Sequence, residues 1–168
     1  MNRELPRRKH IRLKEYDYRL PGIYFVTTNV RGNRCLLSHV QVGRGLAPAE
    51  VRLTELGRIV EEELRDLPRR YPGVTVHKYV IMPNHVHMVL GWETAGASPR
   101  PTLMQVVGAF KSLAARRCNR LRNTPGEAFW QTSFYESVIS SEKVYRDVWQ
   151  YIEENPVRWA EDPYYTDT

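Results

Sequence analysis

The sequence has little cysteine and no long apolar run, and these absences exclude several classes of protein. Cys35 and Cys118 lie far apart and outside any Cys-x-x-Cys spacing, so we expect neither a disulfide scaffold nor a cysteine-based structural zinc site. No apolar stretch has the length of a transmembrane helix or a signal peptide. Internal repeats and low-complexity tracts are also missing. A reduced, cytoplasmic protein that does not enter the membrane is therefore expected.

The length and composition predict one folded domain. The chain has 168 residues, of which 42% are hydrophobic, which is enough for one full core but too little for two ordinary domains. We expect a single domain over residues 16–159. A basic, flexible segment would precede it over residues 1–15, and a short tail would follow over residues 160–168.

Positive charge exceeds negative charge and is unevenly distributed. The 25 Lys and Arg residues against 19 Asp and Glu residues give a formal net charge of +6. Clusters of this kind attract the phosphate backbone of a nucleic acid, although a solvated tail and a solvated helix face explain them equally well. One cluster comprises Arg3, Arg7, Arg8, Lys9, Arg12 and Lys14, and the other comprises Lys111, Arg116, Arg117, Arg120 and Arg122.

Hydrophobic periodicity predicts alternating strands and helices. The strand at residues 22–29 is followed by a turn signal at Arg31–Arg34, which predicts a hairpin with residues 35–37. Later strands are expected over residues 74–82, 85–90 and 130–139. Helices are expected over residues 54–67, capped by Thr54 and ended by Pro68, and over 102–122, with Leu121 in the buried stripe. A third helix, capped by Ser140 and Ser141, is expected to run to about Glu154.

This order of elements predicts an α+β fold. It fits a ferredoxin-like split βαβ antiparallel sheet with helices on one face and an added C-terminal helix.

A His-x-His pair opens one of the expected strands. Side chains alternate along a strand, so His85 and His87 point to the same face and could both bind a divalent metal if a third ligand approached. As an isolated pattern, the pair is also compatible with two ordinary polar residues on a half-exposed strand.

A tyrosine and an asparagine share one face of the last expected helix. Tyr151 and Asn155 are four residues apart, about one helical turn, so the hydroxyl and the amide could face one site. Packing of Tyr151 and a helix stop at Asn155 before Pro156 would explain both residues without any chemistry.

Three segments in order resemble the signature blocks of the REP-associated tyrosine transposases, which are single-tyrosine HUH endonucleases related to the IS200-like transposases. They are Tyr79–His87, Trp130–Glu136 and Tyr151–Arg158. The opening segments at residues 16–18 and 21–27 are also similar, so the resemblance extends from about Tyr16 to Trp159. The sequence departs from many relatives after Pro156, where it continues with Val157 and Arg158 and ends shortly afterwards.

The resemblance implies a metal-dependent single-stranded DNA endonuclease and strand transferase. Tyr151 would be the nucleophile that forms a 5′-phosphotyrosine, and His85, His87 and Asn155 would hold Mg²⁺ or Mn²⁺. The implied substrate is a palindromic DNA hairpin with an adjoining single strand. Both a monomer and a homodimer are compatible with the sequence.

Aromatic and basic side chains are the candidate contacts to this DNA, because bases stack on aromatic rings and cations follow the backbone. A non-catalytic nucleic-acid-binding module and a hydrolase that uses water as nucleophile are the alternatives. The candidate DNA-binding residues are Tyr16, Tyr18, Arg31, Lys111, Arg116 and Arg120.

Overall fold

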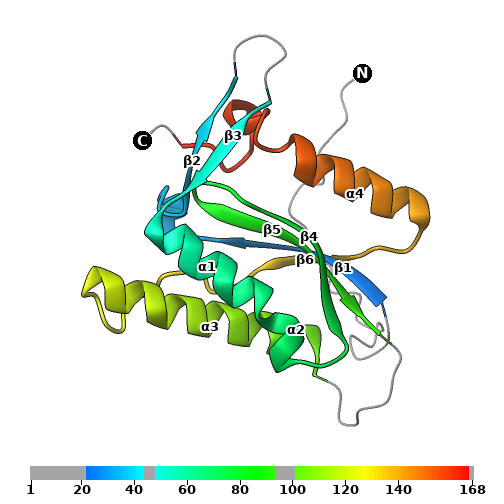
Figure 1. The fold of residues 1–168 in the computed structure, drawn as a ribbon, viewed down its shortest axis with the longest axis horizontal. Coiled ribbons are helices and arrows are strands. Elements are labelled where there is room, and N and C mark those ends of the chain that lie inside the picture. The colour runs from blue at the N-terminus through cyan, green and yellow to red at the C-terminus, as the bar shows by residue number, and fades with distance from the viewer. Residues whose placement is uncertain (1–21, 44–47, 94–100, 167–168) are drawn as a thin grey trace.

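A four-stranded antiparallel sheet forms the centre of the protein (Figure 1). The structure, a computed structural model, describes residues 22–43, 48–93 and 101–166. The strand order is β4-β5-β1-β6, and each neighbouring pair is antiparallel. The strands are β1 (Gly22–Asn29), β4 (Val74–Ile81), β5 (His85–Trp92) and β6 (Tyr135–Val138).

Two helical connections complete the predicted ferredoxin-like fold. Helix α1 (Glu55–Arg65) and the short α2 (Leu67–Arg70) connect β1 to β4, and α3 (Leu103–Arg122) connects β5 to β6. These helices cover one face of the sheet, whereas α4 (Glu142–Glu154) lies on the other (Figure 1). The α+β fold with an added C-terminal helix is therefore confirmed.

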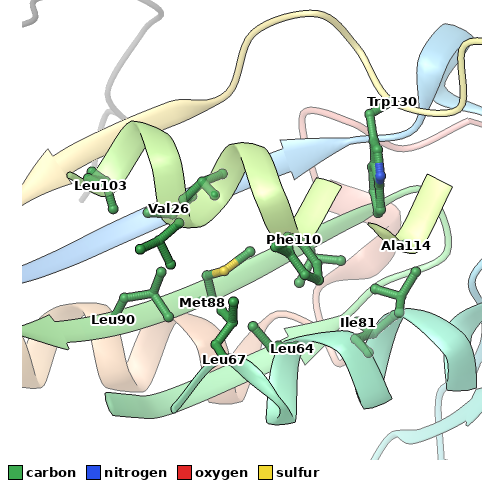
Figure 2. Close-up of a cluster of buried hydrophobic side chains, with 14 of the residues drawn as sticks. Val26, Leu64, Leu67, Ile81, Met88, Leu90, Leu103, Phe110, Ala114 and Trp130 are labelled. Carbon is green, nitrogen blue, oxygen red and sulfur yellow. The ribbon is translucent and has the colours of Figure 1, made fainter. Parts of the chain in front are cut away.

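The alternation of side chains along the strands divides the apolar residues between the two faces. The larger core lies between the sheet and α1 to α3, where Figure 2 shows Val26 and Met88 of the sheet meeting Leu64 and Phe110 of the helices. A smaller cluster lies under α4 and includes Phe25, Val89 and Ile152. The α4 face thus has enough apolar contact to hold the helix while leaving polar positions at one end of the strands.

Hydroxyl side chains begin the three long helices, as the sequence predicted for two of them. Thr54 Oγ1 accepts a hydrogen bond from Gly57 N, and Ser141 Oγ accepts one from Val144 N. Thr102 forms a reciprocal capping box with Gln105 at the start of α3. Such caps satisfy amide groups that the first helical turn leaves free.

The predicted hairpin between residues 22–29 and 35–37 is wrong. β1 is paired along both edges, with β5 and with β6, and so has no edge for a third partner. The chain instead leaves β1 through a 3-10 turn at Arg31–Asn33. It then forms a separate two-stranded sheet from β2 (Ser38–Gln41) and β3 (Glu50–Leu53), and no sequence pattern predicted β3.

Three smaller expectations are also corrected. Leu121 is 47% exposed, since α3 extends beyond the core at its last turn. Pro68 lies in the first turn of α2, where proline needs no amide donor, so it begins a helix. The last strand is shorter than expected, because the chain at Trp130 makes only an isolated bridge with Val30.

Candidate active site

Two buried histidines form the centre of the candidate active site. His85 and His87 begin β5, the second strand of the sheet, and face the α4 side. They are 0% and 2% exposed, and their Nε2 atoms are 3.1 Å apart. Imidazole nitrogens bind zinc at about 2.0 to 2.1 Å, so nitrogens at this separation can bind one ion of similar size.

The second nitrogen of each histidine is held by a neighbouring polar group. His87 Nδ1 is hydrogen-bonded to Thr27 Oγ1 at 2.7 Å, directly across the β1–β5 pair. His85 Nδ1 is hydrogen-bonded to Asn84 Oδ1 at 2.8 Å. Both imidazoles are thereby fixed with Nε2 toward the same point, which is the orientation that two histidines need to bind one metal ion.

Burial keeps the two rings neutral. It lowers the pKa of His87 to about 3, and together with the proximity of His87 it lowers the pKa of His85 well below its ordinary value, while the adjacent Asn155 side chain acts in the opposite direction. Both histidines are therefore uncharged at neutral pH. Neutral imidazole is the form that binds a metal ion.

Tyr151 brings a hydroxyl to this pair from α4. Its Oη lies 3.4 Å from His87 Nε2, and its ring packs edge-on against the rings of His87 and Phe25. Burial is the main cause that raises the pKa of Tyr151 above its ordinary value, and the nearby Asp162 is the second cause. The hydroxyl is consequently protonated at neutral pH and must lose its proton if it acts as a nucleophile.

The other tyrosines near α4 are placed differently. Tyr145 is hydrogen-bonded to His77 at the exposed side of β4, and Tyr135 packs against Phe25 from β6. Tyr164, which the sequence did not suggest, places its ring 4.8 Å from that of His85 between centroids. Tyr151 and Tyr164 are thus the two tyrosines to distinguish by experiment.

Asn155 lies where the sequence predicted it, at the end of α4 beside the histidines. The residue is 4% exposed, and its Nδ2 donates to Asp162 Oδ2 at 3.1 Å. Its Oδ1 is buried without a hydrogen bond of good geometry. A buried carbonyl oxygen without a donor costs free energy unless another partner binds it, and a metal ion would be such a partner.

Asp162 is a site residue that sequence reasoning missed. Its Oδ2 lies 3.8 Å from His85 Nε2, and ligand atoms of His85, His87 and Asp162 all lie within 4.8 Å of one another. Burial raises the pKa of this carboxyl above its ordinary value. Asp162 follows the 3-10 turn Trp159–Glu161, in the segment that the sequence set apart as a tail, and no local pattern marked it.

The predicted DNA-binding residues are dispersed. Arg31 is exposed just beyond β1, and Arg116 and Arg120 are exposed on α3, across the sheet from α4. Lys111 donates all three ammonium protons to the backbone carbonyls of residues 131–133, and its burial lowers its pKa to about 8. Its ammonium thus has no proton left for a phosphate. The predicted contacts Tyr16 and Tyr18 lie outside the described residues.

Comparison with known proteins gives this site its context. A model of the family described as IS200-like transposases matches residues 53–155, which include both histidines, Tyr151 and Asn155. The chain belongs to the IS200-like transposase family. Membership confirms the resemblance found in the sequence and makes the function transposase-like, with DNA as the substrate class.

Individual proteins are similar to this chain in sequence or in fold. A protein of uncharacterised function from Haemophilus influenzae is 29% identical over 181 residues, which cover 99% of this chain and 97% of the relative. A solved REP-associated tyrosine transposase bound to a REP hairpin is 20% identical, covers 86% of this chain and 73% of its own, and superposes with a TM-score of 0.56. A protein described as a candidate transposase from Deinococcus radiodurans is 21% identical, with coverages of 84% and 94% and a TM-score of 0.49.

Among the described residues, no helix has the length and apolar character needed to cross a membrane.

Proposed function

We propose that this transposase-like protein is a metal-dependent single-stranded DNA endonuclease and strand transferase in which Tyr151 is the nucleophile. The observation that supports this proposal best is the 3.4 Å approach of the Tyr151 hydroxyl to a buried, neutral histidine pair. A hydroxyl beside two metal ligands and an unpaired amide oxygen has the groups needed for attack on a phosphodiester.

The proposed reaction is a transesterification. Tyr151 Oη forms a bond to phosphorus, the bond from phosphorus to the 3′ oxygen breaks, and the phosphate stays linked through its 5′ oxygen to the next nucleotide. The phenolic proton leaves to solvent as the bond forms, and the released oxygen becomes a 3′-hydroxyl. Because one phosphoester replaces another, a 3′-hydroxyl can later reverse the step and join strands.

The donor atoms around the pair fit a divalent cation. His85, His87 and Asn155, the predicted set, would hold Mg²⁺ or Mn²⁺, and the Asp162 carboxylate would add a charged oxygen ligand. Mixed nitrogen and oxygen donors suit manganese better than magnesium, which prefers oxygen alone. When bound, the ion would polarise the scissile phosphate and stabilise its developing negative charge.

A hairpin DNA with an adjoining single strand is the proposed substrate. The solved relative that resembles this fold was bound to a REP hairpin, and the net charge of +6 favours a polyanion. Arg31 lies just beyond the end of β1, a strand that lines the site. Among the predicted basic contacts within the described residues, it is the nearest in sequence to such a strand. Tyr16, Tyr18, Arg116 and Arg120 remain proposed contacts.

A covalent-adduct assay tests the nucleophile. End-labelled hairpin oligonucleotides from the DNA flanking the gene are incubated with the purified protein and Mn²⁺, and the products are separated on a denaturing gel. The expected result is a protein-DNA adduct that is lost with EDTA and in Tyr151→Phe but persists in the matched controls Tyr164→Phe and Tyr145→Phe. An adduct in Tyr151→Phe would refute the assignment, and cleavage without any adduct would indicate water as the nucleophile.

The same assay tests the alternative of a non-catalytic binding module. Binding without cleavage, for hairpins from both flanks and with either Mn²⁺ or Mg²⁺, would favour this alternative over the nuclease.

A further inference from the structure

Asn84 connects the histidine pair to the C-terminal segment through a complete set of hydrogen bonds. The residue lies in the turn between β4 and β5 and is fully buried. Its Nδ2 donates to Asn33 O at 3.1 Å and to Tyr164 O at 2.7 Å, while its Oδ1 lies 2.8 Å from His85 Nδ1. Two carbonyl partners require the two amide protons, so the oxygen must face His85.

This arrangement decides which nitrogen of His85 carries the proton. The Asn84 carbonyl oxygen can only accept, so the bond to His85 requires a proton on Nδ1. In a neutral imidazole the other nitrogen then has a free lone pair. His85 Nε2, which faces His87 and Asp162, is therefore held in the form that binds a metal.

The second connection runs from Asn84 to Asp162 through one residue. Asn84 holds the carbonyl oxygen of Tyr164, and the amide nitrogen of Tyr164 donates to Asp162 Oδ1 at 2.7 Å. The remaining carboxylate oxygen, Oδ2, is the one that approaches His85 and Asn155. Asn84 thus fastens the turn that orients the Asp162 carboxylate.

We propose that Asn84 is a positioning residue that sets the His85 tautomer and also anchors the segment carrying Asp162, so that the nitrogen and carboxylate ligands are aligned together. The metal-binding consequence depends on the proposed function, whereas the tautomer does not. Loss of a partner that orients a metal-binding histidine typically weakens metal affinity about 10- to 100-fold.

Manganese affinity of the full-length protein tests the metal-binding consequence. We expect Asn84→Ala to weaken Mn²⁺ binding, measured by calorimetry or electron paramagnetic resonance, about 10- to 100-fold. The control Asn119→Ala removes another buried asparagine, which lies on α3 away from the site and whose Nδ2 donates to Glu127 O. This control should leave affinity within about twofold. Equal affinities for wild type and Asn84→Ala would overturn the proposal.

A double-mutant cycle separates the two connections. Asn84→Asp keeps an acceptor for His85 but cannot donate to Tyr164, so it should lose affinity mainly through Asp162. The fold-loss of Mn²⁺ affinity caused by Asn84→Asp should be at least threefold smaller in an Asp162→Asn background, because the two changes disturb one connection. Independent effects would refute the anchoring role and would leave only the tautomer.

The His85 tautomer is measured on metal-free protein, which keeps this proposal distinguishable from the proposed function. Long-range proton-nitrogen NMR spectra should show the Nδ1-protonated form in wild type, Asn119→Ala and Asn84→Asp, and its loss in Asn84→Ala. An Nε2-protonated His85 in wild type would refute the proposed role. If wild type bound no Mn²⁺ but had the expected tautomer, the metal proposal would fail and the tautomer assignment would stand.

Discussion

Burial of the histidine pair predicts a specific loss of stability in acid. In metal-free protein the pKa of His87 is lowered to about 3, against an unfolded value of 6.5. Between these values the unfolded chain binds more protons than the native protein, so protons favour unfolding. The contribution of neutral His87 is therefore complete above pH 6.5 and is lost progressively as pH falls toward 3.

The magnitude follows from the same two values. One pKa unit corresponds to about 1.4 kcal/mol, so linkage through His87 alone should cost about 2 kcal/mol by pH 5 and about 3 kcal/mol by pH 4, relative to pH 7.5. These are large fractions of the 5 to 15 kcal/mol that usually stabilises a protein. His85, whose pKa is also lowered, adds to the loss in the same direction.

Urea denaturation in EDTA at pH 7.5 and pH 5 measures this effect. Carboxylates also titrate in this range, so the comparison is between wild type and His87→Gln: the pH-dependent loss should be about 2 kcal/mol smaller in the variant. The control His39→Gln changes an exposed residue of β2 and should retain the wild-type loss. Parallel pH dependence in wild type and His87→Gln would refute a buried, neutral His87.

Two further predictions concern the scaffold. Gly57→Ala should lower the free energy of unfolding by more than about 2 kcal/mol in urea melts, because a Cβ would overlap the Leu37 carbonyl oxygen. In the control Gly108→Ala on α3 the new Cβ meets open space, so this change should stabilise the protein by about 0.5 to 1 kcal/mol. Unchanged stability in Gly57→Ala would contradict the close packing. Lys111→Met should lower the free energy of unfolding by about 1 to 2 kcal/mol, because three hydrogen bonds to backbone carbonyls are lost. The control Lys143→Met removes an exposed ion pair and should change stability by less than about 0.5 kcal/mol. Equal stabilities of the two variants would show that the Lys111 contacts add no net stability.

Local signals in the sequence predicted most of the fold. Alternation over residues 22–29 and 85–90 placed two central strands, and Thr54 and Ser141 marked the starts of two helices. These features depend on neighbours within a few residues, so the local sequence determines them. The false hairpin after Arg31 arose because a turn signal does not specify which strand pairs with β1.

The candidate site was predictable to a similar extent. The His-x-His spacing placed His85 and His87 on one face, and the helical spacing placed Tyr151 near Asn155, as the structure shows. Spacing alone did not predict that the two pairs lie close together; the resemblance to a family implied it. Asp162 was missed because its approach to His85 depends on the path of the chain through the 3-10 turn Trp159–Glu161, which no nearby residue pattern predicted.

The site lies at one interface, between β5 and the continuous segment from α4 to the C-terminal turn. The sheet carries His85 and His87, while this segment carries Tyr151, Asn155 and Asp162 in order along the chain. Separation of the strand from this segment would move Tyr151, Asn155 and Asp162 away from the histidines together. Asn84 bonds to both sides of this interface, so its hydrogen bonds link the strand that carries the histidines to the segment that carries Asp162.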